Sequence, residues 1–340
     1  MSSAHQPPLA AAELVSDARW LVQALDLATD MVRVIEMDSE AYRSASFLDD
    51  RILQQPHFAE IVPWASIADA VPVDARSDAR WIFHIGHVGS TLVARLLGEI
   101  DGVLSVREPR VLRDVAMLPA ERRRDYAAPL GKLLSRTFAP DEVALVKATS
   151  FVSEIADELV PQGQRALFMY SAPRAYIASI LAGENSVKEL AALGPSRAQR
   201  MSGRVPGLGG SSEAHAAAAA WACEMTALES AADKMHDRTI AWADFDTMVA
   251  DMPNDLMKAA QTFGFAAPAD RIHLIATGPL MRRYSKAVEF DYSPSLRRKL
   301  IAEAEREHRA DIDSALAMLQ SAAGQSPLLA RALERAQPES

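Results

Sequence analysis

Residues 81–98, with the sequence WIFHIGHVGSTLVARLLG, constrain the fold more than any other stretch of this 340-residue chain. The first five form an apolar run between a charged segment and a glycine, which is typical of a buried strand. Two glycines and two hydroxyl residues follow, and a helix begins near Leu92, with Ser90 or Thr91 available to cap its first turn. A strand, a glycine turn and a helix start bring backbone N–H groups together around a phosphate. The stretch therefore predicts an anion-binding loop, although a plain connection without a ligand would have the same pattern.

The turn departs from the common nucleotide-binding pattern G-x-x-x-x-G-K-[ST]. No lysine precedes the pair Ser90-Thr91, and the spacing between Gly86 and Gly89 is shorter than in that pattern. The missing lysine is the residue that reaches the β- and γ-phosphates of a nucleoside triphosphate. We therefore do not expect an ordinary ATP or GTP hydrolase.

Composition excludes several classes of protein. The formal net charge of -9 argues against a nonspecific nucleic-acid binder, which would usually be basic. Cys223 is the single cysteine, so neither an intrachain disulfide nor a cysteine-rich zinc site is expected. The N-terminus lacks the basic flank and apolar core of a signal peptide, and no apolar run reaches the ~18 residues of a membrane span. We expect a cytoplasmic protein without nucleic-acid or membrane partners and leave its oligomeric state open.

Five short apolar runs alternate with helical segments and predict a parallel sheet covered by helices on both faces. They are residues 81–85, 103–106, 144–149, 166–170 and 239–242. The fold class that follows is α/β, with three layers. Ligands bind such sheets at the carboxyl ends of the strands. Polar residues concentrate at four of these ends, in residues 84–91, 107–109, 147–149 and 171–174.

We divide the chain into an N-terminal extension of residues 1–78, a main domain of residues 79–292 and C-terminal helices of residues 293–340. The extension is expected to contain a helix over residues 10–28 and a strand over residues 31–37, and to act as a cap or a packing element without chemistry of its own. In the main domain, residues 194–212 combine glycines, prolines and three arginines, and predict a mobile lid. A single long helix is expected over residues 294–320.

From about residue 81 to residue 265, the order of motifs resembles the sulfotransferase family, and its tyrosylprotein and bacterial branches more than the cytosolic aryl branch. That family's loop reads P-[KR]-x-G-[ST]-[ST], and Gly89, Ser90 and Thr91 match it. The sequence SVREP lies where the tyrosylprotein branch has G-E-[ET]-R with its catalytic glutamate, and VKATSF is similar to N-K-D-P-F. The segment from FMYSAPR to Ser179 is similar to V-R-[DN]-[GP]-R-x-x-x-x-S, which binds a 3′-phosphate in the family.

The resemblance implies transfer of a sulfuryl group from 3′-phosphoadenosine 5′-phosphosulfate (PAPS) to a hydroxyl or amine of a small-molecule or peptide acceptor, without a metal. Glu108 would take the proton of the acceptor. Lys147 would neutralise the transferring group or the leaving phosphate, and Ser179 would bind the 3′-phosphate. The phosphosulfate would be held by the loop residues, which are Gly86, His87, Val88, Gly89, Ser90 and Thr91.

Two positions depart from the family pattern. His87 stands where the family has a loop lysine or arginine, and only a protonated or hydrogen-bond-donating imidazole would serve in part. Ser171 stands where the family has the arginine that pairs with the 3′-phosphate, which removes a charge-assisted contact. Arg174 could replace that charge, as could a later basic cluster made of Arg282, Arg283 and Lys286.

Two other hypotheses remain open. The first is a kinase-like phosphotransferase that uses another nucleotide donor on the same fold, which the missing lysine and the lack of a strand ending in a Walker-B aspartate oppose. The second is a catalytically degenerate nucleotide-binding or regulatory protein, which His87 and Ser171 favour. Among the remaining polar residues, His84 lies between apolar strand neighbours and is expected to be a hydrogen-bonded core histidine.

Overall fold

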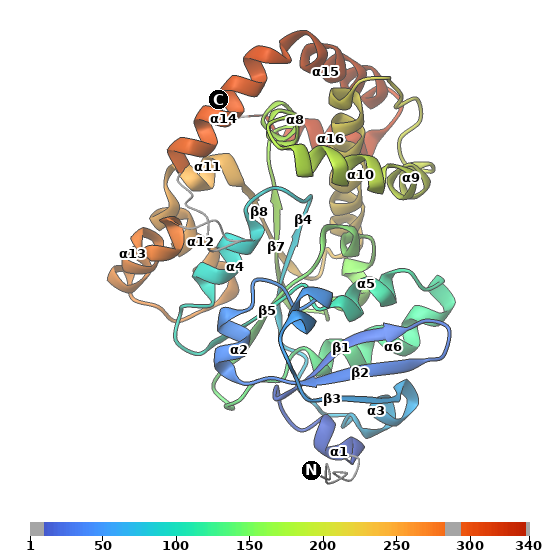
Figure 1. The fold of residues 1–340 in the computed structure, drawn as a ribbon, viewed down its shortest axis with the longest axis vertical. Helices are drawn as coiled ribbons and strands as arrows, with labels where there is room; N and C mark the ends of the chain where they lie inside the picture. The colour runs from blue at the N-terminus through green and yellow to red at the C-terminus, as the bar shows by residue number, and fades with distance from the viewer. Residues whose placement is uncertain (1–9, 283–293, 338–340) are drawn as a thin grey trace.

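The computed structural model describes residues 10–282 and 294–337. Two sheets organise the chain: a three-stranded antiparallel sheet near the N-terminus, and a five-stranded parallel sheet. Figure 1 shows the small sheet in blue at one end of the molecule and the C-terminal helices in red at the other, with the parallel sheet between them.

Residues 10–78 form the N-terminal module, which is built around the antiparallel sheet β1-β2-β3. Its elements are α1 (Ala11–Leu14), β1 (Trp20–Asp26), β2 (Met31–Glu36), α2 (Ser39–Ser44), the 3-10 helix η1 (Asp50–Gln54), β3 (Ala59–Pro63) and α3 (Trp64–Ala70). The strand expected over residues 31–37 is confirmed. The helix expected over residues 10–28 is wrong beyond Leu14, because the chain continues as β1 and pairs with β2. Helix α5 packs on β1, so both faces of this strand are buried and its leucines show no alternation.

The parallel sheet has the order β5-β6-β4-β7-β8. Its strands are β4 (Arg80–His84), β5 (Val103–Arg107), β6 (Val143–Lys147), β7 (Arg165–Tyr170) and β8 (Thr239–Asp244), and they coincide with the five predicted runs. All the pairings are parallel, so the carboxyl ends of the strands lie at one edge of the sheet. The predicted α/β class is confirmed.

Aromatic side chains form a row across one face of this sheet. Phe83 of β4 pairs in register with Phe168 of β7, which in turn pairs with Trp242 of β8. The ring centroids are 5.7 Å apart in the first pair and 5.1 Å in the second, with the rings edge to face in both. Such pairs add about 0.5–1.5 kcal/mol to the burial of the rings. These contacts join the central strand β4 to the edge strand β8 through β7, and they help to hold the three strands in register.

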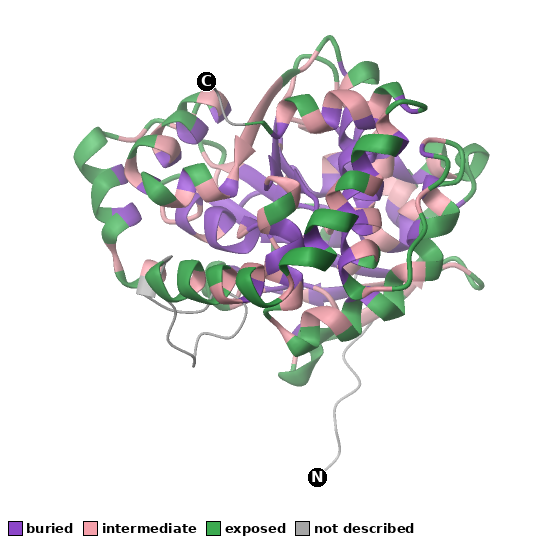
Figure 2. Cartoon of the chain, turned by 90° about the horizontal axis from the view of Figure 1, so that it is seen from above, coloured by how far each residue is buried: buried purple, intermediate pink, exposed green. Residues whose placement is uncertain are grey.

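Helices cover both faces of the sheet, with α4, α12 and α13 on one side and α5 and α10 on the other (Figure 1). The helices of the domain are α4 (Ser90–Leu97), α5 (Arg110–Ala116), α6 (Ala120–Leu133), the 3-10 helix η2 (Ser150–Ile155), α7 (Ala156–Leu159), α8 (Pro173–Leu181), α9 (Glu184–Met201), α10 (Glu213–Lys234), α11 (Phe245–Ala250), α12 (Met252–Phe263), α13 (Ala269–Thr277) and the 3-10 helix η3 (Pro279–Arg282). Figure 2 shows most of the strands in the buried centre, with the exposed residues on the surrounding helices and loops. Within the described part of the chain, no helix is long and apolar enough to cross a membrane.

The lid predicted for residues 194–212 is wrong over its first half, because α9 runs through Gly194 and Pro195. The three arginines of this segment make internal ion pairs. Arg200 lies 2.6 Å from Glu224, and Arg204 lies 2.6 Å from Glu154. Arg197 donates to Glu224 at 3.2 Å. These guanidinium groups fix α9 to its neighbours, and in this state they are not directed at a ligand.

The last described segment contains α14 (Pro294–Glu307), α15 (Arg309–Ala323) and α16 (Pro327–Arg335). The single helix expected over residues 294–320 is therefore wrong. His308 adopts a backbone conformation outside the helical region and separates α14 from α15. Helices α15 and α16 pack on α10, and α14 packs on α8. This arrangement brings the far end of the chain to the carboxyl edge of the parallel sheet.

Candidate active site

The loop between β4 and α4 turns through left-handed backbone conformations. The φ angles are +82° at Gly86, +55° at His87 and +61° at Gly89. A positive φ costs little at glycine but is uncommon at other residues, so His87 is locally strained. Gly89 is the N-cap of α4, which corrects the expectation that Ser90 or Thr91 caps this helix. Both hydroxyl residues lie instead in the first helical turn, whose N–H groups have no acceptor within the helix.

Thr91 adds a second sign that this loop faces a ligand. Its side chain is buried, and its Oγ1 has no hydrogen-bond partner among residues 10–282 and 294–337. Buried hydroxyls are nearly always hydrogen-bonded in native proteins. The N–H groups of the first turn of α4 and this hydroxyl therefore form a set of donors suited to an anion.

Glu108 and Lys147 meet at the ends of the neighbouring strands β5 and β6. The Lys147 ammonium forms an ion pair with Oε1 of Glu108, and the backbone N–H of Glu108 donates to the Lys147 carbonyl at 2.7 Å. Only 1% of the Lys147 side chain is exposed. Glu108 has a φ of +52°, a conformation that costs about 1–3 kcal/mol and is found mainly at functional sites. The structure thus brings together two of the three side chains that were predicted to take part in catalysis, and the third, His87, lines the same pocket.

The charge state of Glu108 follows from its neighbours. Burial by itself would raise the pKa of this carboxyl, but attraction to Lys147, the nearby His84 imidazole and the hydrogen bond from Lys147 outweigh it, so the pKa lies far below its usual range. Glu108 is therefore a carboxylate at neutral pH.

His84 was expected to be a core histidine, and the structure places it in the site. It is the last residue of β4, and 5% of it is exposed. Its Nδ1 accepts the backbone N–H of Gly86 at 2.9 Å, and its Nε2 lies 3.8 Å from Oε1 of Glu108. Nothing in the sequence distinguishes this position from a packing histidine, because the contact with Glu108 depends on the alignment of two strands that are not adjacent.

The N-terminal module also contributes to the site, although no chemistry was expected of it. The Arg51 guanidinium stacks on the ring of Phe47, with 3.3 Å between its central carbon and the ring centroid. It donates to both carboxylate oxygens of Asp49, at 2.8 and 2.6 Å. One of its terminal nitrogens lies 3.9 Å from Oε2 of Glu108. The segment after α2 therefore forms one wall beside the predicted base.

Arg107 holds that wall in place. Its buried guanidinium donates to the backbone carbonyls of Tyr42 and Ala45 at the end of α2, with Nε 2.9 Å from the Ala45 oxygen. In return, the N–H of Leu48 donates to the Arg107 carbonyl at 2.8 Å. Burial lowers the pKa of Arg107 to about 9. An arginine that satisfies the last carbonyls of a helix stabilises the helix end, and here it joins the module to β5.

These groups enclose a pocket of about 140 Å³ at the carboxyl ends of β4, β5 and β6. Its mouth includes Glu189 of α9, whose Oε2 lies 3.6 Å from Nε2 of His87. The remaining lining residues come from the loop, the two strand ends and the module, and are Phe47, Arg51, His84, Gly86, Val88, Gly89, Ser90, Thr91, Glu108, Lys147, Thr149 and Ser150. Residues 10–282 and 294–337 contain no group of three or more His, Cys, Asp or Glu side chains arranged to hold a metal ion.

Ser171 lies at the end of β7 in a second polar cluster beside the loop. Its hydroxyl donates to Asp246 at 2.5 Å, and the other oxygen of Asp246 forms an ion pair with Arg297 of α14. The Arg297 guanidinium lies over the ring of Phe245, which itself packs against Gly89. The side chain of Arg297 is 12% exposed, and its buried Nη2 has no hydrogen-bond partner among the described residues. Nothing in the sequence marks this arginine, because it is one of many charged residues on a helix far along the chain.

The other residues predicted to bind the 3′-phosphate lie in different surroundings. Arg174 is exposed on α8 and lies 2.5 Å from Asp313. The Ser179 hydroxyl donates to the Tyr176 carbonyl within α8 at 2.8 Å. Arg282 ends η3, while Arg283 and Lys286 lie outside the described residues.

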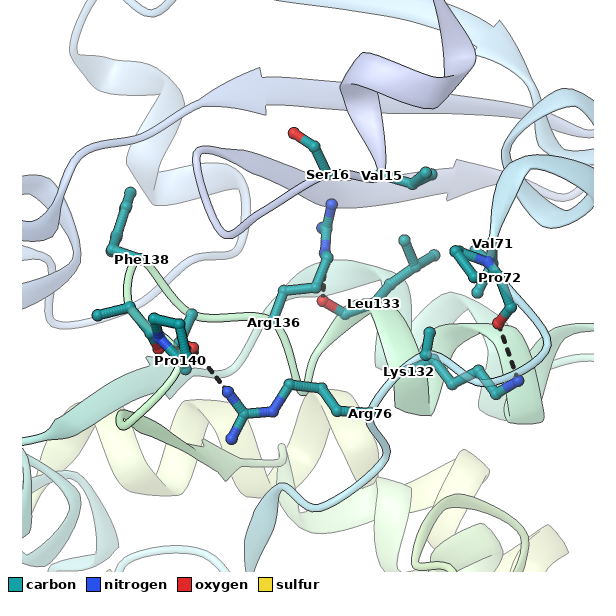
Figure 3. Close-up of a pocket in the computed structure, with 13 residues that line it drawn as sticks. Val15, Ser16, Val71, Pro72, Arg76, Lys132, Leu133, Arg136, Phe138 and Pro140 are labelled. Atoms are coloured by element: carbon teal, nitrogen blue, oxygen red, sulfur yellow. Dashed lines mark hydrogen bonds between the residues drawn. The ribbon is translucent and has the colours of Figure 1, made fainter.

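A second pocket of about 390 Å³ lies between α6 and the N-terminal module (Figure 3). Its three cations already have partners. Arg136 donates to the carbonyls of Leu14 and Trp20, Lys132 donates to the Val73 carbonyl, and Arg76 donates to the Thr137 hydroxyl and the Glu142 carbonyl. Because these contacts join the module to the main domain, this pocket is part of a packing interface.

No family model matches the chain, and no curated protein matches it. Three sulfotransferases are among the solved structures that it resembles. The sulfotransferase domain from the curacin biosynthetic pathway is 13% identical, with 65% of this chain and 86% of that chain covered and a TM-score of 0.38. The sulfotransferase domain from the Synechococcus PCC 7002 olefin synthase is 14% identical, with 69% of this chain and 89% of that chain covered and a TM-score of 0.38. The mouse sulfotransferase SULT7A1 complexed with PAP is 11% identical, with 78% of this chain and 90% of that chain covered and a TM-score of 0.38.

At this identity and TM-score, the similarity carries no information about the donor or the acceptor of this chain. The function has to follow from the residues of the site.

Proposed function

We propose that the protein is a sulfotransferase that moves a sulfuryl group from PAPS to a hydroxyl or amine of a small-molecule or peptide acceptor. One observation carries the proposal. The glycine turn before α4 and a buried glutamate–lysine pair line the same pocket, at the carboxyl edge of a parallel sheet. Such a site holds an anionic donor next to a base.

The proposed chemistry depends on positioning and charge. The N–H groups of residues 88–91 and the Thr91 hydroxyl hold the phosphosulfate of the donor. The acceptor oxygen forms a bond to sulfur while the bond between sulfur and the bridging oxygen breaks, and the electron pair of that bond stays on the leaving phosphate. Glu108 takes the proton of the acceptor, and Lys147 stabilises the negative charge that develops.

The lowered pKa of Glu108 determines when the proton moves. A carboxylate of this kind is ionised at neutral pH and ready to accept, but it is a weak base. The acceptor hydroxyl becomes acidic only as its oxygen bonds to sulfur. We therefore expect proton transfer to be late. Protonation of Glu108 would release the Lys147 ammonium from its ion pair at the moment when charge appears on the leaving group.

Arg297 is our candidate for the charge that is missing at Ser171. It forms an ion pair with Asp246, which the Ser171 hydroxyl also contacts, and its Nη2, which has no hydrogen-bond partner among the described residues, has a donor to offer. Arg174 and Ser179 remain predictions for the same role.

The test is calorimetric titration of the purified protein with adenosine 3′,5′-bisphosphate, and with AMP and ATP as controls. Micromolar binding of the bisphosphate with much weaker binding of AMP is expected, followed by acceptor-dependent loss of sulfate from PAPS. A preference for ATP would instead indicate a phosphotransferase. Bisphosphate binding without transfer to any acceptor would indicate a nucleotide-binding protein that has lost catalysis.

A further inference from the structure

We infer that His84 is a positioning residue that gives the two carboxylate oxygens of Glu108 different roles. With Lys147 it holds Oε1, which leaves Oε2 to take the proton of the acceptor. The same imidazole fixes the start of the anion-binding loop. The assignment of a proton-accepting oxygen rests on the proposed function, whereas the geometry of the His84 ring does not.

The protonation of the ring follows from one contact. Because the Gly86 N–H donates to Nδ1 at 2.9 Å, Nδ1 presents its lone pair and the proton of a neutral imidazole resides on Nε2. His84 is buried at the end of β4, where it pairs in register with Met169 of β7. Its orientation is therefore set by the strand on one side and by the loop on the other.

The Nε2–H of this tautomer lies toward Glu108. Nε2 is 3.8 Å from Oε1, the oxygen that also pairs with Lys147. A movement of less than about 1 Å would bring it to hydrogen-bonding distance, and catalytic hydrogen bonds are often long before substrate binds. On the other oxygen, Arg51 lies 3.9 Å from Oε2 and also lines the pocket.

The charged and titratable groups around Glu108 thus come from three elements: Lys147 from β6, His84 from β4 and Arg51 from the N-terminal module. Two of them converge on Oε1. Oε2 is the oxygen toward Arg51 and the wall that the module provides, and we expect the acceptor hydroxyl to approach it from the pocket that these residues line. In the proposed step, the proton moves from the acceptor oxygen to Oε2, and His84 keeps its own proton throughout.

Two substitutions separate the two contacts of the ring. The amide oxygen of His84→Asn occupies the position of Nδ1 and can accept the Gly86 N–H, but it leaves Oε1 without this donor. The amide nitrogen of His84→Gln reaches the position of Nε2 and can donate to Oε1, but it abandons Gly86. Each variant is therefore the control for the other.

We expect His84→Asn to lower kcat with PAPS by about tenfold or more while the Kd for adenosine 3′,5′-bisphosphate is unchanged. We expect His84→Gln to keep most of kcat and to raise that Kd, because the loop is less well fixed. Equal effects of the two variants on both quantities, or no effect on either, would overturn the inference.

A spectroscopic measurement tests the geometry without any acceptor or donor. In protein labelled with ¹⁵N-histidine, the His84 signal, assigned by its absence from the variants, should show a protonated Nε2 and an unprotonated Nδ1. In protein labelled with ¹³C-glutamate, the pKa of Glu108 should rise in His84→Asn and stay near that of the wild type in His84→Gln. A proton on Nδ1, or an unchanged Glu108 pKa in both variants, would refute the role of His84. Failure of bisphosphate binding with these signals intact would refute the proposed function alone.

Discussion

The ring of Phe245 packs directly on Gly89. A β-carbon added at Gly89 would overlap three carbons of that ring, and the φ of +61° at this position is itself unfavourable for other residues. Glycine is therefore required here for two independent reasons. The contact couples the loop between β4 and α4 to α11, the helix that follows β8.

Gly89→Ala should impair both stability and donor binding. The substitution has to displace Phe245 or distort the turn, and local strain of about 1–3 kcal/mol corresponds to a loss of affinity between several-fold and about a hundredfold. Calorimetry with adenosine 3′,5′-bisphosphate and a thermal melt measure the two effects. Gly163→Ala is the matched control, because Gly163 has a φ of +73° with no atom within 4 Å of an added β-carbon. If the two variants lose equal stability and bind equally well, the contact with Phe245 is unimportant.

Lys147→Met should destabilise the fold markedly. It removes the partner of a buried carboxylate, and breaking a buried ion pair on one side typically costs about 3–5 kcal/mol. Denaturation in urea measures the change. The double variant Glu108→Gln with Lys147→Met leaves no unpaired charge and should recover a large part of the loss. A double variant as unstable as Lys147→Met would mean that the ion pair does not account for the effect.

The protein should become less stable as the pH is lowered, in a range set by the titration of Glu108. The pKa of this carboxyl is lowered in the folded state, so its stabilising contribution is complete above the pKa of about 4.3 in the unfolded chain and is lost as the pH falls below it. The difference in unfolding free energy between the wild type and Glu108→Gln should shrink by about 1.4 kcal/mol per pH unit below that point. Denaturation series at several pH values measure this slope. A difference that stays constant from neutral pH to pH 3 would contradict the assigned charge state.

Arg297→Met should weaken binding of adenosine 3′,5′-bisphosphate by about tenfold or more and leave AMP binding nearly unchanged, since a charge-assisted contact to the 3′-phosphate is lost. Arg174→Met is the comparison, because Arg174 is exposed and paired with Asp313. Titrations of both variants decide between the two arginines. If Arg174→Met weakens bisphosphate binding and Arg297→Met does not, Arg174 is the residue that binds the 3′-phosphate, as the sequence motif predicts.

Strands β4, β5, β6 and β7 could be predicted because both of their faces are buried, which makes each a continuous apolar run with polar residues at its carboxyl end. The edge strand β8 is only partly buried, but its alternating Ile240 and Trp242 still gave an apolar run. Burial on both faces is also the reason why β1 was not predicted as a strand from the sequence. Its burial on both faces removes the alternation that marks an antiparallel strand, and its leucine spacing is also typical of a helix. Local glycines and prolines suggested a lid, but the ion pairs of α9 with Glu224 and Glu154 override them.

Within the site, Glu108 and Lys147 could be found from motifs because each ends a strand. His84, Arg51 and Arg297 could not, because their roles arise from tertiary contacts. The register between β4 and its neighbours brings His84 to Glu108, the module carries Arg51, and α14 returns Arg297 to the strand ends. A single sequence has no local signal for such contacts.

The hydrogen bonds of Arg107 to the end of α2 span 62 to 65 residues of chain, and β1 is covered by α5, which is also formed from later sequence. During synthesis, the N-terminal module therefore leaves the ribosome well before the residues that anchor it and bury its exposed face. Contacts of such long range form slowly, and unpaired apolar surface invites aggregation in the interval. The part of the chain made first is thus completed only after β5 and α5 have been made, and the wall beside Glu108 cannot be fixed before that point.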